Sequence, residues 1–374
     1  MTSAVTLRVT ALFHASRRHL VTLTSKCGAP GRPDTCSKMP RVASLHIYPI
    51  KSCRGIRLDT AQLLAHGLAH DRDWMVVHAG GPFIGTFISQ RTHPALACVI
   101  PRLIDKCCEV HLDADALRAS LTAPISGYPE SAAGDKAARI LSVCSTPLRL
   151  PFTVTTPNTV DLVAGPPAAS VAVQVWRDTF QALDAGDDAA QWFSALLACP
   201  VRLVRFDPTV TRLASARWTA GVEAPTHFAD GFPLLLTNQA SLDDLNQKMM
   251  RKGAPAIPMD RFRPNVVLTD MDAYEEDHVS TLTFASALEQ APGQEPIEIQ
   301  LVKPCARCPI PTFDQTTGRA NDAWPYEPLD TLTTYRMNSR VDGVTFGVNA
   351  IVISGVGRRL HCGMDADAPV DFGN

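Results

Sequence analysis

The sequence predicts a mainly β protein of the α+β class. Short runs in which apolar and polar residues alternate, separated by Gly, Pro, Asn and Asp, recur along the chain and are typical of strands. Clear helical periodicity occurs in only a few places. Strands and helices do not alternate strictly and no repeat is found, which argues against a doubly wound parallel sheet or a solenoid.

Composition narrows the class further. The 374 residues are enough for two domains or for one large domain with insertions. Hydrophobic residues make up 45% and charged residues 19%, as in soluble globular proteins. A net charge of −2 and a pI near 6.6 do not indicate a nucleic-acid-binding surface or adhesion to a membrane. No apolar run approaches the roughly 18 to 20 residues that cross a bilayer, so no transmembrane segment is expected.

The eleven cysteines are odd in number and scattered, which favours a reducing compartment over a disulfide framework. The first 38 residues are basic, rich in Ser and Thr, and contain a single acid, Asp34. This composition fits either an organelle transit peptide or an upstream extension before a start at Met39. We favour the extension and therefore a cytoplasmic location, with mitochondrial-type targeting as the alternative.

The first half of the chain is expected to form an antiparallel sheet or barrel, with a hairpin turn at Gly80-Gly81. The expected strands are Val42–Ile50, Arg57–Leu64, Trp74–His78, Phe83–Ile88, Leu96–Leu103, Cys108–Leu112, Leu117–Leu121, Val171–Trp176 and Phe180–Leu183.

The second half combines two helices with further strands. The first helix is expected to begin at a cap made by Asp187-Asp188 and to end before Pro200. The second is expected to open with a capping box at Ser241–Asp244, to bury Leu245 and Met249, and to end at Gly253. The expected strands are Val201–Phe206, Leu234–Thr237, Val266–Thr269, Ile297–Val302, Thr345–Phe346 and Ala350–Ser354.

The strongest chemical motif is Cys305-Ala306-Arg307-Cys308, which follows an expected strand and precedes Pro309 and Pro311. Four interpretations stay open on this motif alone. A structural zinc site lacks a second ligand pair, and a thioredoxin-like dithiol would need a helix that the prolines oppose. The remaining two are an inert pair of core cysteines and a single thiolate, favoured by Arg307, that binds a soft metal or a cofactor.

Two other patterns are rejected as sites. Gly355-Val356-Gly357 lacks the third glycine and the following helix of a dinucleotide loop. His66 and His70 have helical zinc spacing, but no third ligand shares their motif. The sequence also has no nucleophile elbow and no P-loop.

Three further stretches indicate a phosphorylated heterocyclic cofactor beside a thiolate. Tyr48–Gly55 places Lys51 and Ser52 in a turn after a strand, where they can bind an anion. Asp71–Trp74 adds an arginine, and Arg261–Asn265 places a guanidinium and an amide before a strand. Guanidinium groups suit phosphate, and amides suit the edge of a heterocycle.

With these stretches in view, the sequence resembles the MOSC family with its N-terminal β-barrel domain, and within it the mitochondrial amidoxime reducing components and their bacterial counterparts. The similarity runs from about Val42 to Val356. Its ordered motifs are Tyr48–Gly55, Asp71–Trp74, Phe228–Pro233, Ser241–Asn246, Arg261–Asn265, Cys305–Cys308 and Phe346–Asn349. The resemblance implies an N-terminal barrel domain over 39–165, a MOSC domain over 200–365 and a tail over 366–374.

The resemblance also implies a molybdenum cofactor, a metal on a pterin dithiolene, with Cys308 as the protein ligand and Cys305 unbound. Pyridoxal phosphate is not expected. By the same matching, Lys51, Ser52 and Arg72 would hold the phosphate side of the pterin. The residues that would line the pterin or the metal are Asp230, Gly231, Phe232, Arg263, Asn265, Ala306, Arg307 and Asn349. Relatives carry small hydroxyl residues where this chain has Gly231 and Phe232.

The implied activity is the reduction of hydroxylamines, amidoximes and N-hydroxylated bases by two-electron cleavage of the N–O bond, with Asp230 as a proton relay. Electrons would come from a separate flavin reductase, cytochrome b5-type protein or ferredoxin, because the chain has too few thiols after Cys308 for an iron–sulfur cluster. Two alternatives remain, a carrier that passes sulfur through a Cys308 persulfide and a non-catalytic cofactor-binding module.

Overall fold

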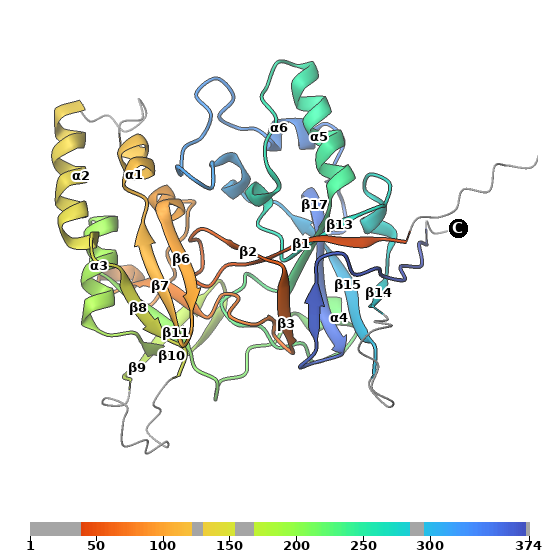
Figure 1. The fold of residues 1–374 in the computed structure, drawn as a ribbon, viewed down its shortest axis with the longest axis horizontal. Coiled ribbons are helices and arrows are strands. Elements are labelled where there is room, and N and C mark those ends of the chain that lie inside the picture. The colour runs from red at the N-terminus through yellow and green to blue at the C-terminus, as the bar shows by residue number, and fades with distance from the viewer. Residues whose placement is uncertain (1–38, 122–129, 154–167, 285–294, 372–374) are drawn as a thin grey trace, which may run out of the picture. The chain divides into compact units, whose positions relative to one another are not determined.

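A computed structural model describes residues 39–121, 130–153, 168–284 and 295–371. The predicted leader, 1–38, lies outside these residues, as does the end of the predicted tail. The described part is rich in short strands, as Figure 1 shows. The mainly β class is therefore confirmed.

The described part contains strands, α-helices and short 3-10 helices (Figure 1). The strands are β1 (Arg41–Ile47), β2 (Ile56–Leu58), β3 (Thr60–Leu64), β4 (Gly67–Leu68), β5 (Trp74–His78), β6 (Val99–Ile104), β7 (Cys107–Leu112), β8 (Leu148–Pro151), β9 (Ser170–Val175), β10 (Asp178–Asp184), β11 (Val201–Phe206), β12 (Leu234–Asn238), β13 (Val266–Thr269), β14 (Thr281–Phe284), β15 (Ile297–Ala306), β16 (Met337–Asn338), β17 (Gly343–Ser354) and β18 (Arg359–His361). The α-helices are α1 (Ala114–Leu121), α2 (Glu130–Cys144), α3 (Asp187–Leu197), α4 (Ala216–Thr219), α5 (Gln239–Arg251) and α6 (Leu329–Thr333). The 3-10 helices are η1 (Gly81–Phe83), η2 (Pro94–Cys98), η4 (Met259–Phe262), η5 (Glu275–His278) and η6 (Ile310–Thr312).

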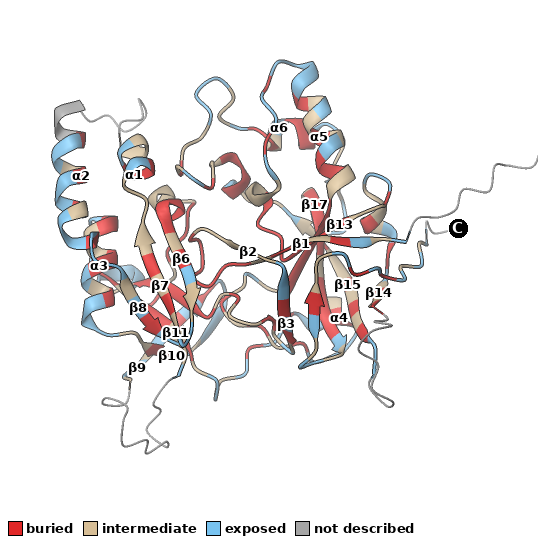
Figure 2. Cartoon of the chain, in the orientation of Figure 1, coloured by how far each residue is buried: buried red, intermediate tan, exposed pale blue. Residues whose placement is uncertain are grey.

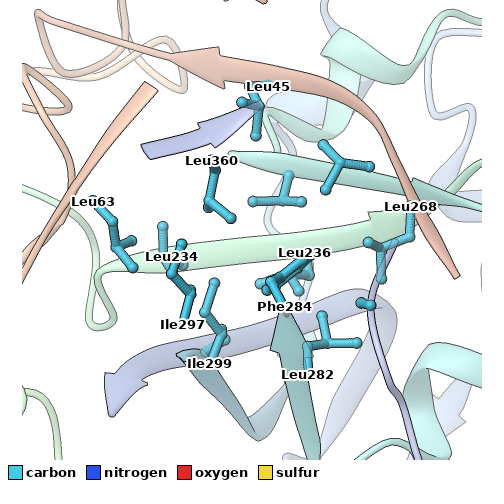
Figure 3. Packing of buried hydrophobic residues seen from close by; sticks show 14 of the residues in the cluster. Leu45, Leu63, Leu234, Leu236, Leu268, Leu282, Phe284, Ile297, Ile299 and Leu360 are labelled. Carbon is cyan, nitrogen blue, oxygen red and sulfur yellow. The ribbon is translucent and has the colours of Figure 1, made fainter. Parts of the chain in front are cut away.

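The largest sheet has the strand order β14-β15-β17-β12-β13-β1-β2. Its pairs are antiparallel except β12 with β13, which run parallel. Alternate residues of these strands point to one interior, and Leu45, Leu236, Leu282 and Ile299 belong to the buried cluster that fills it (Figure 3). Burial of this apolar cluster holds β15 and β17 in place, and these strands carry the cysteine motif and Asn349.

A second group of strands forms two smaller sheets, β5-β11-β10-β9 and β6-β7-β8. Helices α2 and α3 pack on β7, β8 and β11, and α1 lies against α2 (Figure 1). Buried residues line the sides of these elements that face each other, while α2 is largely exposed on its outer side (Figure 2). Among the residues described, no helix has the length and apolar content to cross a membrane.

Most expected elements are confirmed, but three of the expected strands differ in the structure. Leu117–Leu121 is helical, because Asp113 caps α1 through its carboxylate, which accepts from the Ala116 amide at 3.0 Å. Phe83–Ile88 forms only isolated bridges after η1, although the hairpin direction is kept. The expected strand Leu96–Leu103 begins as η2 and becomes β6 only at Val99.

The expected caps of both helices differ as well. Helix α3 has the expected range, but Asp187 and Asp188 lie in its first turn and the Gly186 cap has no side-chain bond. Helix α5 begins earlier than expected, because Asn238 accepts from the Ala240 amide at 3.0 Å. Ser241 therefore lies inside the helix rather than at its cap. Helix α2 was not expected from the sequence.

Candidate functional site

All twelve residues that the resemblance places in a site line one cavity of about 430 Å³. They come from loops after β1 and β4, from the segment before β12, from the turn before β13, and from β15, β17 and the loop that follows β15. These residues are Lys51, Ser52, Arg72, Asp230, Gly231, Phe232, Arg263, Asn265, Ala306, Arg307, Cys308 and Asn349.

The cavity is strongly cationic. Its charged lining consists of Lys51, Arg72, Arg91, Arg263 and Arg307, against the single carboxylate of Asp230. Like charges this close in a partly desolvated site repel one another. The arrangement therefore fits a ligand that carries several negative charges.

Tyr48 is the platform on which two of these guanidinium groups rest. The guanidinium carbons of Arg72 and Arg263 lie 4.3 Å and 4.2 Å from the centre of the Tyr48 ring. The ring is buried, and its hydroxyl donates to the Pro264 carbonyl at 3.1 Å. A Cβ on Gly55 would lie 2.5 Å from the ring, so the glycine at this motif position makes room for Tyr48.

Three cavity residues adopt left-handed backbone conformations that side-chain-bearing residues rarely take. The φ angles are 68° at Ser52, 52° at Arg72 and 57° at Arg263. Such conformations cost free energy and concentrate at functional sites, where the surrounding structure maintains them. Here the Arg72 amide donates to the Tyr48 carbonyl at 2.9 Å, and the Arg263 amide donates to the backbone carbonyl of Asp260 at 3.0 Å.

Lys51 and Asp230 form an ion pair at the cavity wall. The Lys51 ammonium donates to Asp230 Oδ1 at 2.5 Å and to the Phe228 carbonyl at 2.7 Å. Burial lowers the pKa of Lys51. Desolvation alone would raise the pKa of Asp230, but Lys51, together with Arg91, outweighs it and holds that pKa well below its usual range. Asp230 is therefore a carboxylate at neutral pH.

Arg91 and Trp176 belong to the same cavity wall, but the sequence did not predict them as site residues. Arg91 stacks on the Trp176 ring at 4.5 Å, and Trp176 Nε1 donates to Asp230 at 3.4 Å. The available signal for Arg91 was its place in a polar Ser89-Gln90-Arg91 run directly after an expected strand. Nothing in the local sequence marks Trp176.

Arg212 was also missed, although it holds the segment that carries Asp230. Its side chain is buried and donates to the carbonyls of His227 at 2.7 Å, Ala229 at 2.6 Å and Asp230 at 3.2 Å. It also pairs with Asp178 at 2.8 Å. One planar guanidinium can satisfy several acceptors in this way because its donors form a rigid fork.

The two cysteines of the motif occupy different environments. The Arg307 guanidinium donates to Cys305 Sγ at 3.1 Å and to the Phe262 carbonyl at 2.9 Å. Cys305 lies on β15, whereas Cys308 lies in the loop between β15 and η6. Both cysteines line the cavity and neither is in a disulfide.

The two asparagines of the predicted site also stabilise the fold. Asn265 accepts from the Leu235 amide at 3.1 Å and donates to the His46 carbonyl at 3.2 Å. Asn349 donates to the Lys303 carbonyl at 3.2 Å. The Asn265 side chain also hydrogen-bonds the buried Asp71 carboxyl group. Asn349 has a second amide hydrogen and retains donor capacity toward the cavity that it lines.

Unsatisfied donors support a polyanionic ligand. The Nε atoms of Arg91 and Arg307 are buried and have no hydrogen-bond partner within the described ranges. Arg263 is buried, and its desolvation lowers its pKa to about 10. Its guanidinium donates to a neutral partner, the Gln315 amide oxygen, at 2.9 Å. Buried cations of this kind are stabilised when an anion supplies the missing acceptors.

The rejected pair His66 and His70 lies in a cluster with Asp73 and His227. Donor atoms of His66, Asp73 and His227 lie within 4.8 Å of one another. His66 and His227 are stacked with ring centres 3.6 Å apart, and His227 Nδ1 bonds Asp73 at 2.9 Å. This set contains His66 but not His70, so the spaced pair His66 and His70 does not itself form the ligand group.

Comparison with known proteins identifies the parts of the chain. The family described as MOSC N-terminal beta barrel domain matches residues 39–144, and the family described as MOSC domain matches residues 223–358. The chain is 28% identical to "Mitochondrial amidoxime-reducing component 1" of Mus musculus, over 88% of this chain and 81% of that protein. It is 29% identical to "Mitochondrial amidoxime reducing component 2" of Bos taurus, over 82% of this chain and 76% of that protein.

A third relative has another name. The chain is 29% identical to "Molybdenum cofactor sulfurase" of Pyricularia oryzae, over 86% of this chain but only 38% of that protein. The residues matched by the two families include every residue that lines the cavity except Trp176. The chain belongs to the MOSC family, with a MOSC N-terminal beta barrel domain followed by a MOSC domain.

Proposed function

We propose that this protein is a molybdenum-cofactor oxidoreductase that reduces N-hydroxylated compounds, among them hydroxylamines, amidoximes and N-hydroxylated bases. One observation carries the proposal: a thiol, Cys308, and five cations line the same cavity. Molybdenum binds thiolate, and the phosphate of a pterin cofactor needs cationic partners. The names of the amidoxime-reducing relatives support the substrate class.

In this proposal, Cys308 is the metal ligand, and Lys51, Ser52 and Arg72 hold the phosphate. Arg307 and Arg263 face the pterin. The Nε of Arg307 has no hydrogen-bond partner within the described ranges, and Arg263 donates to a neutral amide oxygen, so both can donate to the cofactor. Gly231, Phe232, Asn265 and Ala306 contribute backbone or side-chain surface, and Asn349 contributes its second amide hydrogen. The bound cofactor supplies the two-electron chemistry for cleavage of an N–O bond.

The chain itself handles the protons. Reduction of R₂N–OH to R₂NH and water consumes two electrons and two protons. Asp230 is held ionised by Lys51, so it can accept a proton or position one but does not donate its own at neutral pH. The Lys51 ammonium, whose pKa is lowered by burial, is the acidic member of the pair. We propose that the relay is this pair rather than Asp230 alone.

The electrons are proposed to come from a separate flavin reductase, cytochrome b5-type protein or ferredoxin. The domain boundaries 39–165 and 200–365 and the cytoplasmic location also stay predictions. Fractionation of cells that express the full chain would test the location, since the relatives named above are mitochondrial by name.

Replacing Cys308 tests the central assignment. We expect Cys308→Ser to lose bound molybdenum and the reduction of an amidoxime, because the metal loses its protein thiolate. Cys305→Ser is the matched control, because it removes a thiol from the same cavity. It should keep both molybdenum and activity, because Cys305 is not the proposed metal ligand. Metal analysis of the purified proteins and an amine-release assay give the readouts. Retention of molybdenum and turnover in Cys308→Ser would overturn the assignment.

A second candidate, favoured by the sulfurase-named relative, is a sulfur carrier that uses a Cys308 persulfide. It differs from the first in its product. A carrier would show sulfane sulfur on Cys308 and no turnover of N-hydroxylated compounds, which mass spectrometry and the same amine-release assay distinguish.

A further inference from the structure

Three cations converge on one indole ring beside the cavity. The charged groups of Arg217, Lys303 and Arg340 lie 5.5 Å, 5.4 Å and 5.6 Å from the centre of the Trp218 ring. They come from α4, from β15 and from the turn between β16 and β17. We call these four residues the Trp218 patch.

The patch has no counter-charge of its own. No carboxylate in the described ranges forms an ion pair with Arg217, Lys303 or Arg340, although ion pairs are frequent elsewhere in the same ranges. Arg217 and Arg340 are exposed and Trp218 is partly exposed. Three cations around one ring repel each other, and an anionic surface placed over them would relieve that repulsion.

The patch adjoins the cavity wall. Lys303 Nζ also lies 5.7 Å from the ring of Phe232, which lines the cavity. The Lys303 carbonyl accepts from Asn349, another lining residue. Trp218 packs against the cluster that contains Phe232. A protein bound over the patch would therefore lie next to the cavity that holds Cys308.

Exposed apolar side chains flank α4, as is typical of a protein-binding surface. Leu213 and Val222 precede and follow this helix and are 43% and 40% exposed. Tryptophan and arginine are the residue types that contribute most to protein–protein binding. Cations supply orientation and a faster encounter with an acidic partner.

We infer that the Trp218 patch is the docking surface for the electron donor, a redox protein whose contact surface is acidic. The inference rests on the proposed reductase function, because only a reductase of this kind needs such a donor. It adds the chemistry of the partner and the place where it binds.

The test compares the wild-type protein with the triple variant Arg217→Gln, Lys303→Gln and Arg340→Gln. Amidoxime reduction is driven by three donors: reduced benzyl viologen, a ferredoxin with its reductase, and a cytochrome b5 with its reductase. The control, Arg57→Gln, Arg102→Gln and Lys106→Gln, removes the same charge from exposed residues elsewhere.

With benzyl viologen as donor, we expect the patch variant to reduce the amidoxime as fast as the wild type. This result would show that the site of reduction is intact. With the protein donor that supports wild-type turnover, its KM for that donor should rise about tenfold, and its salt dependence should flatten. The control variant should behave as the wild type. An unchanged donor KM in the patch variant, an equal rise in the control, or failure of both protein donors with an active wild type would overturn the inference.

A wild type that is inactive even with benzyl viologen would refute the reductase function instead. Direct binding of ferredoxin and of cytochrome b5, measured by calorimetry at low and high salt, then decides the patch. Salt-sensitive binding of either protein that is lost only in the patch variant supports it. Equal binding by the patch and control variants, or no binding, overturns it.

Discussion

Tyr48 and Gly55 show how a single contact shapes the cationic cavity. The Tyr48 ring supports Arg72 and Arg263, and it fits only because position 55 has no Cβ. The sequence motif Tyr48–Gly55 thus joins the turn of Lys51 and Ser52, which we propose binds phosphate, to the platform for two guanidinium groups. The sequence predicted only Lys51 and Ser52 of this motif as ligands, whereas the role of Tyr48 became visible through its contacts in the structure.

We expect Gly55→Ala to destabilise the protein by about 1 to 3 kcal/mol, because the new methyl group overlaps the Tyr48 ring. Displacement of that ring should also reduce molybdenum content. Urea unfolding and metal analysis are the measurements. Gly134→Ala is the control, since its Cβ meets no atom within 4 Å and lies in helix α2. Equal stability of Gly55→Ala and the wild type would contradict the role given to Tyr48.

Arg212 gives a second prediction for a single residue. Arg212→Lys keeps the charge but cannot satisfy three carbonyls and Asp178 at once, so some buried acceptors lose their partner. We expect a loss of about 2 to 3 kcal/mol in the free energy of unfolding, measured in urea. Arg251→Lys, on the exposed face of α5, should change it little. A small change in the free energy of unfolding of Arg212→Lys would show that residues 227–230 keep their conformation without these hydrogen bonds.

At the scale of elements, Glu276 joins η5 to α5. Its buried carboxyl accepts from Ser241 Oγ at 2.8 Å and from the Asn238 amide at 3.3 Å. Burial, with the neighbouring charge of Asp277, raises the pKa of Glu276 to about 7 from an ordinary 4.5. The protonated form is therefore the one that the folded state favours. Ser241 was predicted as a cap, but its real partner is this carboxyl group.

This pKa gives a pH dependence with a definite sign. Because the folded-state pKa is raised, the contribution of Glu276 is fully present below about pH 4.5 and is lost as pH rises through about 7. We expect the wild type to lose on the order of 3 kcal/mol over this window relative to Glu276→Gln, which does not titrate. Urea unfolding of both proteins at pH 5 to 8 measures the difference. Parallel pH profiles would show that Glu276 does not titrate in this range.

Predictability differs between elements for physical reasons. Strands such as β5, β11 and β13 were predicted because apolar residues bounded by turn residues mark them. Leu117–Leu121 was assigned to a strand although Leu117 and Leu121 have helical spacing and follow a capping aspartate. Helix α2 was overlooked despite buried Ala133, Ala137, Ile140 and Cys144 at helical spacing, since small residues give a weak apolar signal.

For the whole molecule, pairing between distant strands could not be read from local patterns. Strands β1 and β2 precede every other strand but lie in the sheet of β12 to β17, and β18 pairs with β3. Strand β11 pairs with β5 of the first half. The ordered motifs predicted twelve residues that the structure places around one cavity. No motif marked Arg91, Trp176 or Arg212, which bond Asp230 from distant parts of the chain.

This topology predicts that the predicted second domain does not fold alone. A fragment of residues 200–371 would lack β1 to β4 and with them Leu45, Ile47, Leu63 and Leu68 of the largest core cluster.

At about 1.5 to 3 kcal/mol each, losing these four buried side chains costs about 6 to 12 kcal/mol, which is comparable to the about 5 to 15 kcal/mol by which a typical protein is stable. We expect the 200–371 fragment to show no cooperative thermal transition by circular dichroism, whereas a 39–371 protein unfolds cooperatively. A cooperative transition in the shorter fragment would mean that β12 to β17 form a stable core without β1 and β2. The pairing of β1 and β2 with the strands of the second half would then be needed to form the cavity but not to stabilise either half.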